Sequence, residues 1–228
     1  MSNIIISADV ESLNELWKIF ETMGSNVDII KIHHDIITDF TVDLDLTIEK
    51  INKYKHDYNF LVWEDRKYAD IGYIMEKQVK NHVSKWADII SVQPISGIES
   101  VMQLSFIKVI LIGEMSSSNT LCNDKYKKCV TEMTDLLPNV IGIVCQSKMT
   151  ETKLNIVPGI SLKNKKDGKG QCYNTMKDRS FADYYVVGRS ILNSENPQDT
   201  LTTYMKEYEE VHKSNLGNSR SKLLELLK

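Results

Sequence analysis

Short runs of apolar residues alternate along the chain with longer segments in which apolar residues recur every three or four positions. The short runs predict eight strands, at residues 3–7, 27–32, 60–63, 88–92, 107–112, 140–144, 154–157 and 184–187. The longer segments predict helices at residues 12–23, 44–54, 71–87, 97–104, 123–137, 198–212 and 220–228. The helical spacing is clearest in the first helix, where one face collects Leu13, Leu16, Trp17, Phe20 and Met23.

The order of these elements indicates an α/β fold with a parallel sheet, because nearly every strand is followed by a helix rather than by a hairpin. The strand cores are mostly continuous runs of Val, Ile and Leu, which is typical of strands buried on both faces. An open sheet with helices on both sides and a (β/α)8 (TIM) barrel both fit this pattern, and the number of strands favours the barrel. Since no internal repeat or low-complexity linker is visible, we predict a single domain over residues 1–228.

The composition narrows the possible partners and the compartment. The net charge is −3, from 28 basic and 31 acidic residues, so nothing points to nucleic acid or an anionic membrane surface as a partner. The apolar runs are far shorter than the roughly 20 residues that span a bilayer, and the N-terminus lacks the basic stretch of a signal peptide. No C-x-x-C pair is formed by the cysteines, Cys122, Cys129, Cys145 and Cys172. We therefore expect a cytoplasmic protein with reduced thiols and no zinc site.

Polar residues follow the predicted strands at the points where these strands end. They are Asp9, Lys31, Asp65, Lys67, Ser116 and Arg189. In a (β/α)8 barrel the carboxyl ends of the strands form the rim on which active sites are built. Strand ends are exposed and often polar in any case, which explains one such residue but explains the whole set less easily. The sequence therefore predicts a polar site at the rim of the barrel.

A lysine between two carboxylates is the most informative part of this set. Asp65 and Lys67 are two positions apart, so in extended backbone their side chains point the same way. Asp70 lies where the next helix begins, and it either belongs to the site or caps that helix. Opposite charges nearby favour the charged form of Lys67, which suits a proton donor better than a Schiff-base amine. A solvated ion pair is the alternative for Asp65 and Lys67.

A second group of residues suggests a phosphate site. Residues 158–173 form a long connection with three glycines and four lysines, which is typical of a mobile loop that attracts anions. The loops after strands seven and eight of such barrels often bind phosphate, and Gly188-Arg189 would lie beside this loop. A merely solvated lysine loop is the alternative. His33 and His34 are adjacent, so on a strand they point to opposite faces and do not suggest a shared metal.

With these motifs in this order, the chain resembles the orotidine 5′-monophosphate decarboxylases of the eukaryotic type over nearly its whole length. Residues 64–72, Glu-Asp-Arg-Lys-Tyr-Ala-Asp-Ile-Gly, are similar to the signature of that family. Further motifs of the family are matched by residues 7–9, 31–36, 114–117, 158–173 and 186–189. The resemblance implies a stand-alone decarboxylase domain that converts orotidine 5′-monophosphate to UMP without a metal or an organic cofactor.

The resemblance also implies roles for particular residues. Lys67 would give a proton to C6 of the pyrimidine as carbon dioxide leaves, with Asp65 and Lys31 beside it. Asp70 would enter the site from the other subunit of a homodimer. Contacts to the ribose, the base and the phosphate are implied for Asp9, Lys31, His33, Ser116, Pro158, Gln171, Tyr173, Gly188 and Arg189.

The sequence departs from the family pattern at three places. Tyr73-Ile74 replaces the Asn-Thr that usually follows the signature, so a threonine hydroxyl that would reach the partner's ribose site is missing. Cys172 stands where a glutamine is common, and residues 91–94 lack the usual Asn-Ala-His run. Two other functions stay open. One is a nucleotide-binding protein that has lost catalysis, and the other is a Mg²⁺-dependent sugar-phosphate decarboxylase or aldolase-like relative with the same Asp-x-Lys-x-x-Asp core.

Overall fold

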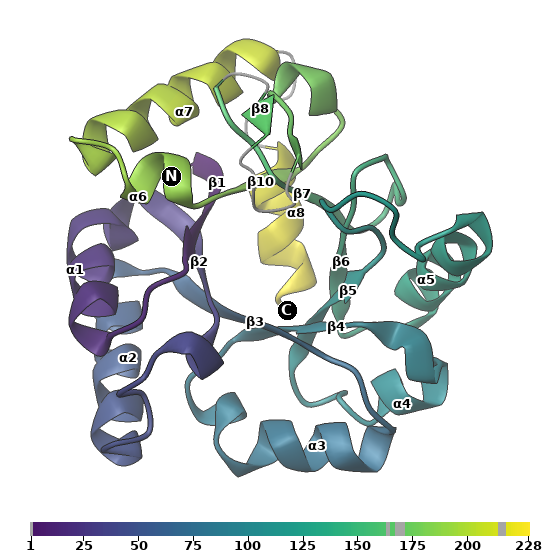
Figure 1. Cartoon of the computed structure of the whole chain (residues 1–228). Helices are drawn as coiled ribbons and strands as arrows, with labels where there is room; N and C mark the ends of the chain where they lie inside the picture. Colours follow the sequence, from purple (N-terminus) through teal and green to yellow (C-terminus); the bar gives the residue numbers. More distant parts are fainter. Residues whose placement is uncertain (1, 163–164, 167–171, 214–217) are drawn as a thin grey trace.

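The computed structural model of the chain describes residues 2–162, 165–166, 172–213 and 218–228. Within these residues, eight parallel strands close into a barrel in the order β1-β10-β7-β6-β5-β4-β3-β2 (Figure 1). The barrel strands are β1 (Ser2–Ala8), β2 (Val27–Ile32), β3 (Leu61–Tyr68), β4 (Ile89–Val92), β5 (Lys108–Ile112), β6 (Val140–Val144), β7 (Leu154–Pro158) and β10 (Tyr184–Val187). The predicted (β/α)8 barrel is therefore confirmed.

Helices surround the barrel on its outside, which buries both faces of the parallel sheet (Figure 1). They are α1 (Leu13–Met23), α2 (Leu44–Tyr58), α3 (Gly72–Asn81), α4 (Ile98–Met102), α5 (Asp124–Leu136), α6 (Arg189–Leu192) and α7 (Pro197–Val211). Helix α1 begins where the sequence indicates, because Ser12 Oγ accepts a hydrogen bond from Glu15 N at 3.3 Å. No helix joins β6 to β7, a connection that the structure describes throughout.

Several segments differ from the predicted elements. Strand β3 continues to Tyr68, α2 continues to Tyr58, and the short helix α6 was not predicted. The helix predicted over residues 71–87 ends at Asn81, because His82 leaves the helical conformation and a short 3-10 turn (Val83–Lys85) turns Trp86 into the core. The connection at residues 158–173, predicted to be a loop, contains a short antiparallel pair, β8 (Lys165–Lys166) with β9 (Cys172–Tyr173). Strands of two residues are too short to leave a recognisable alternation in the sequence.

Alternate residues of the barrel strands face two separate cores. In β1, Ile4 and Ile6 pack outward against the helices, whereas Ile5 faces the interior of the barrel. The inner core takes one or two apolar residues from each strand, and its largest members are Trp63 and Tyr184. Most strands thus direct every second residue toward the barrel axis, and the last of these residues reach the rim. Strand β6 departs from this alternation, because Ile141 and Val144 both face the inner core.

Helix α8 (Asn218–Leu226) covers the end of the barrel that lies opposite this rim (Figure 1). Leu223 belongs to the inner core, and Leu226 packs against it. The helix is also held by polar contacts, since Arg220 Nε lies 3.2 Å from Asp28 Oδ1 and Lys108 Nζ donates to the main-chain oxygen of Leu226 at 2.8 Å. None of the described helices is both long and apolar enough to cross a membrane.

Candidate active site

The carboxyl ends of the barrel strands surround a cavity of about 190 Å³. Most of the residues predicted to form the site line this cavity: Asp9, Lys31, His33, Asp65, Lys67, Ser116, Pro158, Tyr173, Gly188 and Arg189. They come from strands that are far apart in the sequence, and the closed barrel brings their ends together. Gln171, predicted to contact both base and phosphate, lies outside the described residues.

Two lysines and one aspartate meet at the floor of the cavity. Lys67 Nζ lies 2.9 Å from Asp65 Oδ2, and Lys31 Nζ lies 3.1 Å from the same oxygen. Lys67 Nζ also donates to the main-chain oxygen of Asp65 at 3.2 Å. Asp65 and Lys31 are buried, whereas the Lys67 side chain keeps 25% of its surface exposed toward the cavity. Of these three side chains, Lys67 is therefore the one most exposed to a ligand in the cavity.

The opposite charges of the array stabilise one another in their ionised forms. Burial alone would raise the pKa of Asp65, but the ammonium groups of Lys31 and Lys67 lower that pKa to about 2. Burial alone would likewise lower the pKa of Lys31, but the carboxylates of Asp65 and Asp9 raise it above its ordinary value. Asp65 and Lys31 are thus both ionised at neutral pH. Asp65 Oδ1 is buried and accepts no hydrogen bond from the described residues.

Asp9 and His33 extend the array along one wall of the cavity. Ser7 Oγ donates to Asp9 Oδ1 at 2.9 Å, and Lys31 Nζ lies 3.3 Å from that oxygen. His33 Nε2 lies 3.4 Å from Asp65 Oδ2. Burial, followed by repulsion from the Lys31 ammonium, lowers the pKa of His33 to about 4, so the imidazole is neutral at pH 7. A neutral imidazole beside a carboxylate can offer a proton to hydrogen bonding without adding a charge.

The backbone at Lys67 is not extended, although the prediction that Asp65 and Lys67 point the same way assumed extended backbone. Lys67 has a positive φ of 61°, and the pairing of β3 with β4 shifts register between Glu64 and Tyr68. The side chains of Asp65 and Lys67 do meet, as predicted, but extended geometry is not the reason. They meet because the chain turns at Lys67 and folds its ammonium back over Asp65.

The phosphate end of the predicted site lies where β7 and β10 end. The Arg189 guanidinium lies 5.9 Å from the centre of the Tyr173 ring, so these two predicted phosphate ligands are neighbours. Gln146 Nε2 donates to the main-chain oxygen of Pro158 at 3.1 Å, which fixes the end of β7. A Cβ on Gly188 would lie 3.0 Å from Ser7 Cβ and 3.1 Å from the Ser7 main-chain oxygen. A side chain at position 188 would therefore be tight against β1, and Ser7 would have to shift to admit it.

Asp70 lies outside the cavity of its own chain. It is exposed, and its Oδ1 accepts a hydrogen bond from Ile71 N at 2.7 Å. The alternative that Asp70 caps the next helix is wrong, because Ile71 occupies the N-cap position of α3 and no side chain caps this end. Tyr73 and Ile74 follow in the first turn of α3. Tyr73 is 59% exposed, and Lys77 Nζ lies 4.3 Å from the centre of its ring.

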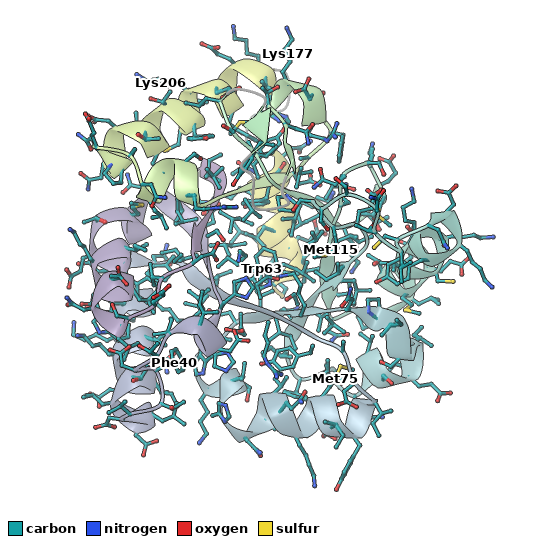
Figure 2. All side chains as sticks on the ribbon, viewed as in Figure 1. Phe40, Trp63, Met75, Met115, Lys177 and Lys206 are labelled. Carbon is teal, nitrogen blue, oxygen red and sulfur yellow. The ribbon has the colours of Figure 1, made fainter. Side chains whose placement is uncertain are left out.

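Several residues that the motifs in the sequence did not point to also line the cavity, and most of them are apolar. Trp63 forms part of the floor together with Met115, and both lie near the barrel axis (Figure 2). Val144, Ile160 and Val186 also belong to this apolar surface. The alternation of side chains along a strand could have identified Ser7, Trp63 and Val186. Each stands two positions before a residue predicted to belong to the site, namely Asp9, Asp65 or Gly188. Trp63 Nε1 has no hydrogen-bond partner among the described residues.

His34, Asp35 and Glu64 form a second polar cluster, outside the cavity. Their nitrogen and oxygen atoms lie close enough together to hold a metal ion. Both oxygens of Glu64 already accept hydrogen bonds, however, from His34 N at 3.1 Å and from Arg66 N at 3.0 Å. His33 faces the cavity whereas His34 packs beside Phe40 and Trp86, so the two histidines point in opposite directions as expected. Glu64 thus joins the turn after β2 to β3 by hydrogen bonds, a role that needs no ion.

Residues 2–204 match the family described as orotidine 5′-phosphate decarboxylase / HUMPS. The chain belongs to this family. Among curated proteins, it is 34% identical over 224 residues to an orotidine 5′-phosphate decarboxylase of Mucor circinelloides f. lusitanicus, which covers 91% of this chain and 82% of that protein. It is 31% identical over 236 residues to an orotidine 5′-phosphate decarboxylase of Aspergillus fumigatus, with 90% of this chain and 84% of that protein covered.

This member of the orotidine 5′-phosphate decarboxylase / HUMPS family is also similar to a longer curated protein and to a solved structure. Uridine 5′-monophosphate synthase of Bos taurus is 31% identical over 231 residues, which are 95% of this chain but 48% of that protein, so the chain spans about half of its length. The crystal structure of orotidine 5′-phosphate decarboxylase from Pyrococcus horikoshii superposes with a TM-score of 0.72. The superposition covers 90% of this chain and 99% of the Pyrococcus horikoshii chain at 21% sequence identity, which shows a shared fold.

Proposed function

We propose that this chain decarboxylates orotidine 5′-monophosphate to UMP, with no cofactor, through the charged array on the floor of its cavity. The observation that carries the proposal is the contact of Lys67 and Lys31 with a single carboxylate oxygen of Asp65 at the barrel rim. Membership of the orotidine 5′-phosphate decarboxylase / HUMPS family supports the substrate class. The relatives of similar length are named orotidine 5′-phosphate decarboxylases.

In the proposed reaction, the bond between C6 and the carboxylate carbon breaks and its electron pair stays on C6. Carbon dioxide leaves, and the C6 carbanion takes a proton from Lys67 Nζ, which regains one from solvent. A fixed ammonium near C6 lowers the energy of the developing carbanion, because its charge is already in place before the reaction begins. Asp65 holds that ammonium at 2.9 Å, and its own pKa of about 2 keeps it ionised.

The other cavity residues would bind the parts of the nucleotide that do not react. Asp9 and Lys31 would hold ribose hydroxyls, and Ser116 would contact the base. Arg189 and Tyr173 would hold the phosphate, together with Gln171, which lies outside the described residues. Phosphate binding far from C6 can supply the energy that closes the site and excludes water.

Asp70 is proposed to complete the cavity of a second copy of the chain in a homodimer. It is exposed and lies apart from the cavity of its own chain, yet it belongs to the signature that carries Asp65 and Lys67. Ile71 and Tyr73, which follow it in the chain, are 60% and 59% exposed, so Asp70 is followed by exposed apolar side chains. A dimer would cover these side chains and would bring an additional carboxylate toward the partner's array.

The loss of orotidylate absorbance with purified protein tests the proposed reaction. We expect turnover that persists in EDTA and is lost in Lys67→Met. Folded protein that binds UMP without turnover would instead favour a binding protein. Turnover of a sugar phosphate that needs Mg²⁺ would favour the alternative enzyme.

A mixing experiment tests the dimer. Lys67→Met and Asp70→Asn homodimers should each be inactive, whereas a mixture of the two should regain activity. One of the two sites in a mixed dimer combines an intact Lys67 with an intact Asp70. A mixture as inactive as its components would contradict the shared site.

A further inference from the structure

Two buried polar side chains flank the turn that carries Lys67, and neither lines the cavity. Glu64 precedes Asp65 on β3, and Ser91 lies on the neighbouring strand β4. Both are 0% exposed. A fully buried polar group is retained only where its hydrogen bonds are satisfied, so the partners of these two side chains indicate what they do.

Glu64 joins the ends of β2 and β3. Its Oε2 accepts from His34 N at 3.1 Å, and its Oε1 accepts from Arg66 N at 3.0 Å. His34 Nδ1 lies 3.0 Å from the same Oε1. His34 follows His33 of the cavity wall, and Arg66 stands between Asp65 and Lys67. One carboxylate thus holds both chain segments from which the charged array projects.

Ser91 holds the next peptide group along this turn. Lys67 N donates to Ser91 Oγ at 3.1 Å. Lys67 has a φ of 61°, a left-handed conformation that a residue with a Cβ rarely adopts. Such a conformation persists only where surrounding contacts impose it, and the regular ladder between β3 and β4 is interrupted here. The hydrogen bonds of Arg66 N and Lys67 N are the contacts that replace the ladder.

We propose that Glu64 and Ser91 are positioning residues that hold Lys67 in its left-handed conformation and so place its ammonium beside Asp65. Their effect on turnover rests on the proposed decarboxylation. Ser91 lies in residues 91–94, where the sequence departs from the family pattern. Its role is therefore one that the family pattern does not supply. Without these two acceptors the backbone at Lys67 would relax toward a commoner conformation, and the ammonium would move away from the position that the reaction needs.

Substitutions that remove one acceptor at a time test the proposal. Ser91→Ala and Glu64→Gln should each lower kcat by about 100-fold, the effect of moving a reacting group by about 1 Å. The Kd of UMP should stay within about threefold, since these residues do not touch the cavity. Ser91→Thr keeps the hydroxyl and should regain most of the kcat.

Matched controls lie at the opposite end of the barrel. Asp28→Asn changes a buried carboxylate that accepts from Tyr184 Oη at 3.1 Å, and Ser219→Ala removes a buried hydroxyl on α8. Both should keep the kcat of the unaltered chain even if they lower its melting temperature. Equal losses of kcat in the controls, or a loss confined to KM, would overturn the positioning role.

Amide hydrogen exchange, followed by NMR, tests the positioning without any turnover. In Ser91→Ala the amide of Lys67 should exchange at least about tenfold faster, and in Glu64→Gln the amide of Arg66 should do so. Unchanged protection of both amides overturns the proposal. If the unaltered chain does not decarboxylate orotidine 5′-monophosphate, the proposed function fails, and these amides still decide whether Glu64 and Ser91 hold the turn. Should one variant not fold, the other carries the test.

Discussion

The neutral state of His33 makes stability depend on pH in a way that can be worked out from the structure. Burial and the Lys31 ammonium lower the pKa of His33 from its ordinary 6.5 to about 4. Between these values the unfolded chain binds a proton that the folded chain does not, so stability falls as the pH falls. Above pH 6.5 the contribution of His33 is fully present. The pKa difference corresponds to about 3 kcal/mol at 1.36 kcal/mol per pKa unit.

The perturbation that isolates this contribution is His33→Gln, which cannot take up the proton. The free energy of unfolding should be measured in urea at pH 7, 5.5 and 4, at one protein concentration, because association also changes apparent stability. Between pH 7 and pH 4 the unaltered chain should lose about 3 kcal/mol more than the variant does.

Carboxylates also titrate near pH 4, but they do so in both proteins, so the comparison isolates the histidine. His56→Gln is the control, since the His56 side chain is 90% exposed and such changes alter stability by about 0.5 kcal/mol or less. If the unfolding free energies of the unaltered chain and of His33→Gln stay parallel from pH 7 to pH 4, folding does not lower the pKa of His33.

Three further substitutions test the array and the barrel rim. Lys31→Met deprives buried Asp65 of one cation, so the free energy of unfolding at pH 7, measured in urea, should fall by about 3–5 kcal/mol. A loss below about 1 kcal/mol would show that Asp65 does not need this partner. Gly188→Ala pushes a methyl group against Ser7 and should lower the free energy of unfolding, measured by calorimetry, by about 1–3 kcal/mol. An unchanged melting temperature would mean that β1 and β10 can move apart there without loss of stability. Lys67→Met should lower kcat by at least about 100-fold with the fold intact in circular dichroism, and near-normal turnover would exclude Lys67 as the proton donor.

Much of the barrel follows from local patterns in the sequence. Apolar runs and helical spacing predict all eight barrel strands, since both signals depend on residues within one segment. Parity along a strand also predicts which residues face the axis, so that Asp9, Lys31 and Asp65 are expected at one rim. The helix predicted over residues 71–87 is wrong beyond Asn81, because the burial of Trp86 against Phe40 and His34 overrides the helical spacing.

The sequence by itself thus determined the strands, their inward faces and the identity of the charged residues at the rim. Only the tertiary structure decided how these residues meet. Lys31 reaches Asp65 because Lys31 pairs with Trp63 in the register between β2 and β3, which no local pattern specifies. Lys67 reaches Asp65 through a left-handed turn held by a serine from another strand. Register and buried hydrogen bonds depend on partners far away in the chain, whereas side-chain periodicity does not.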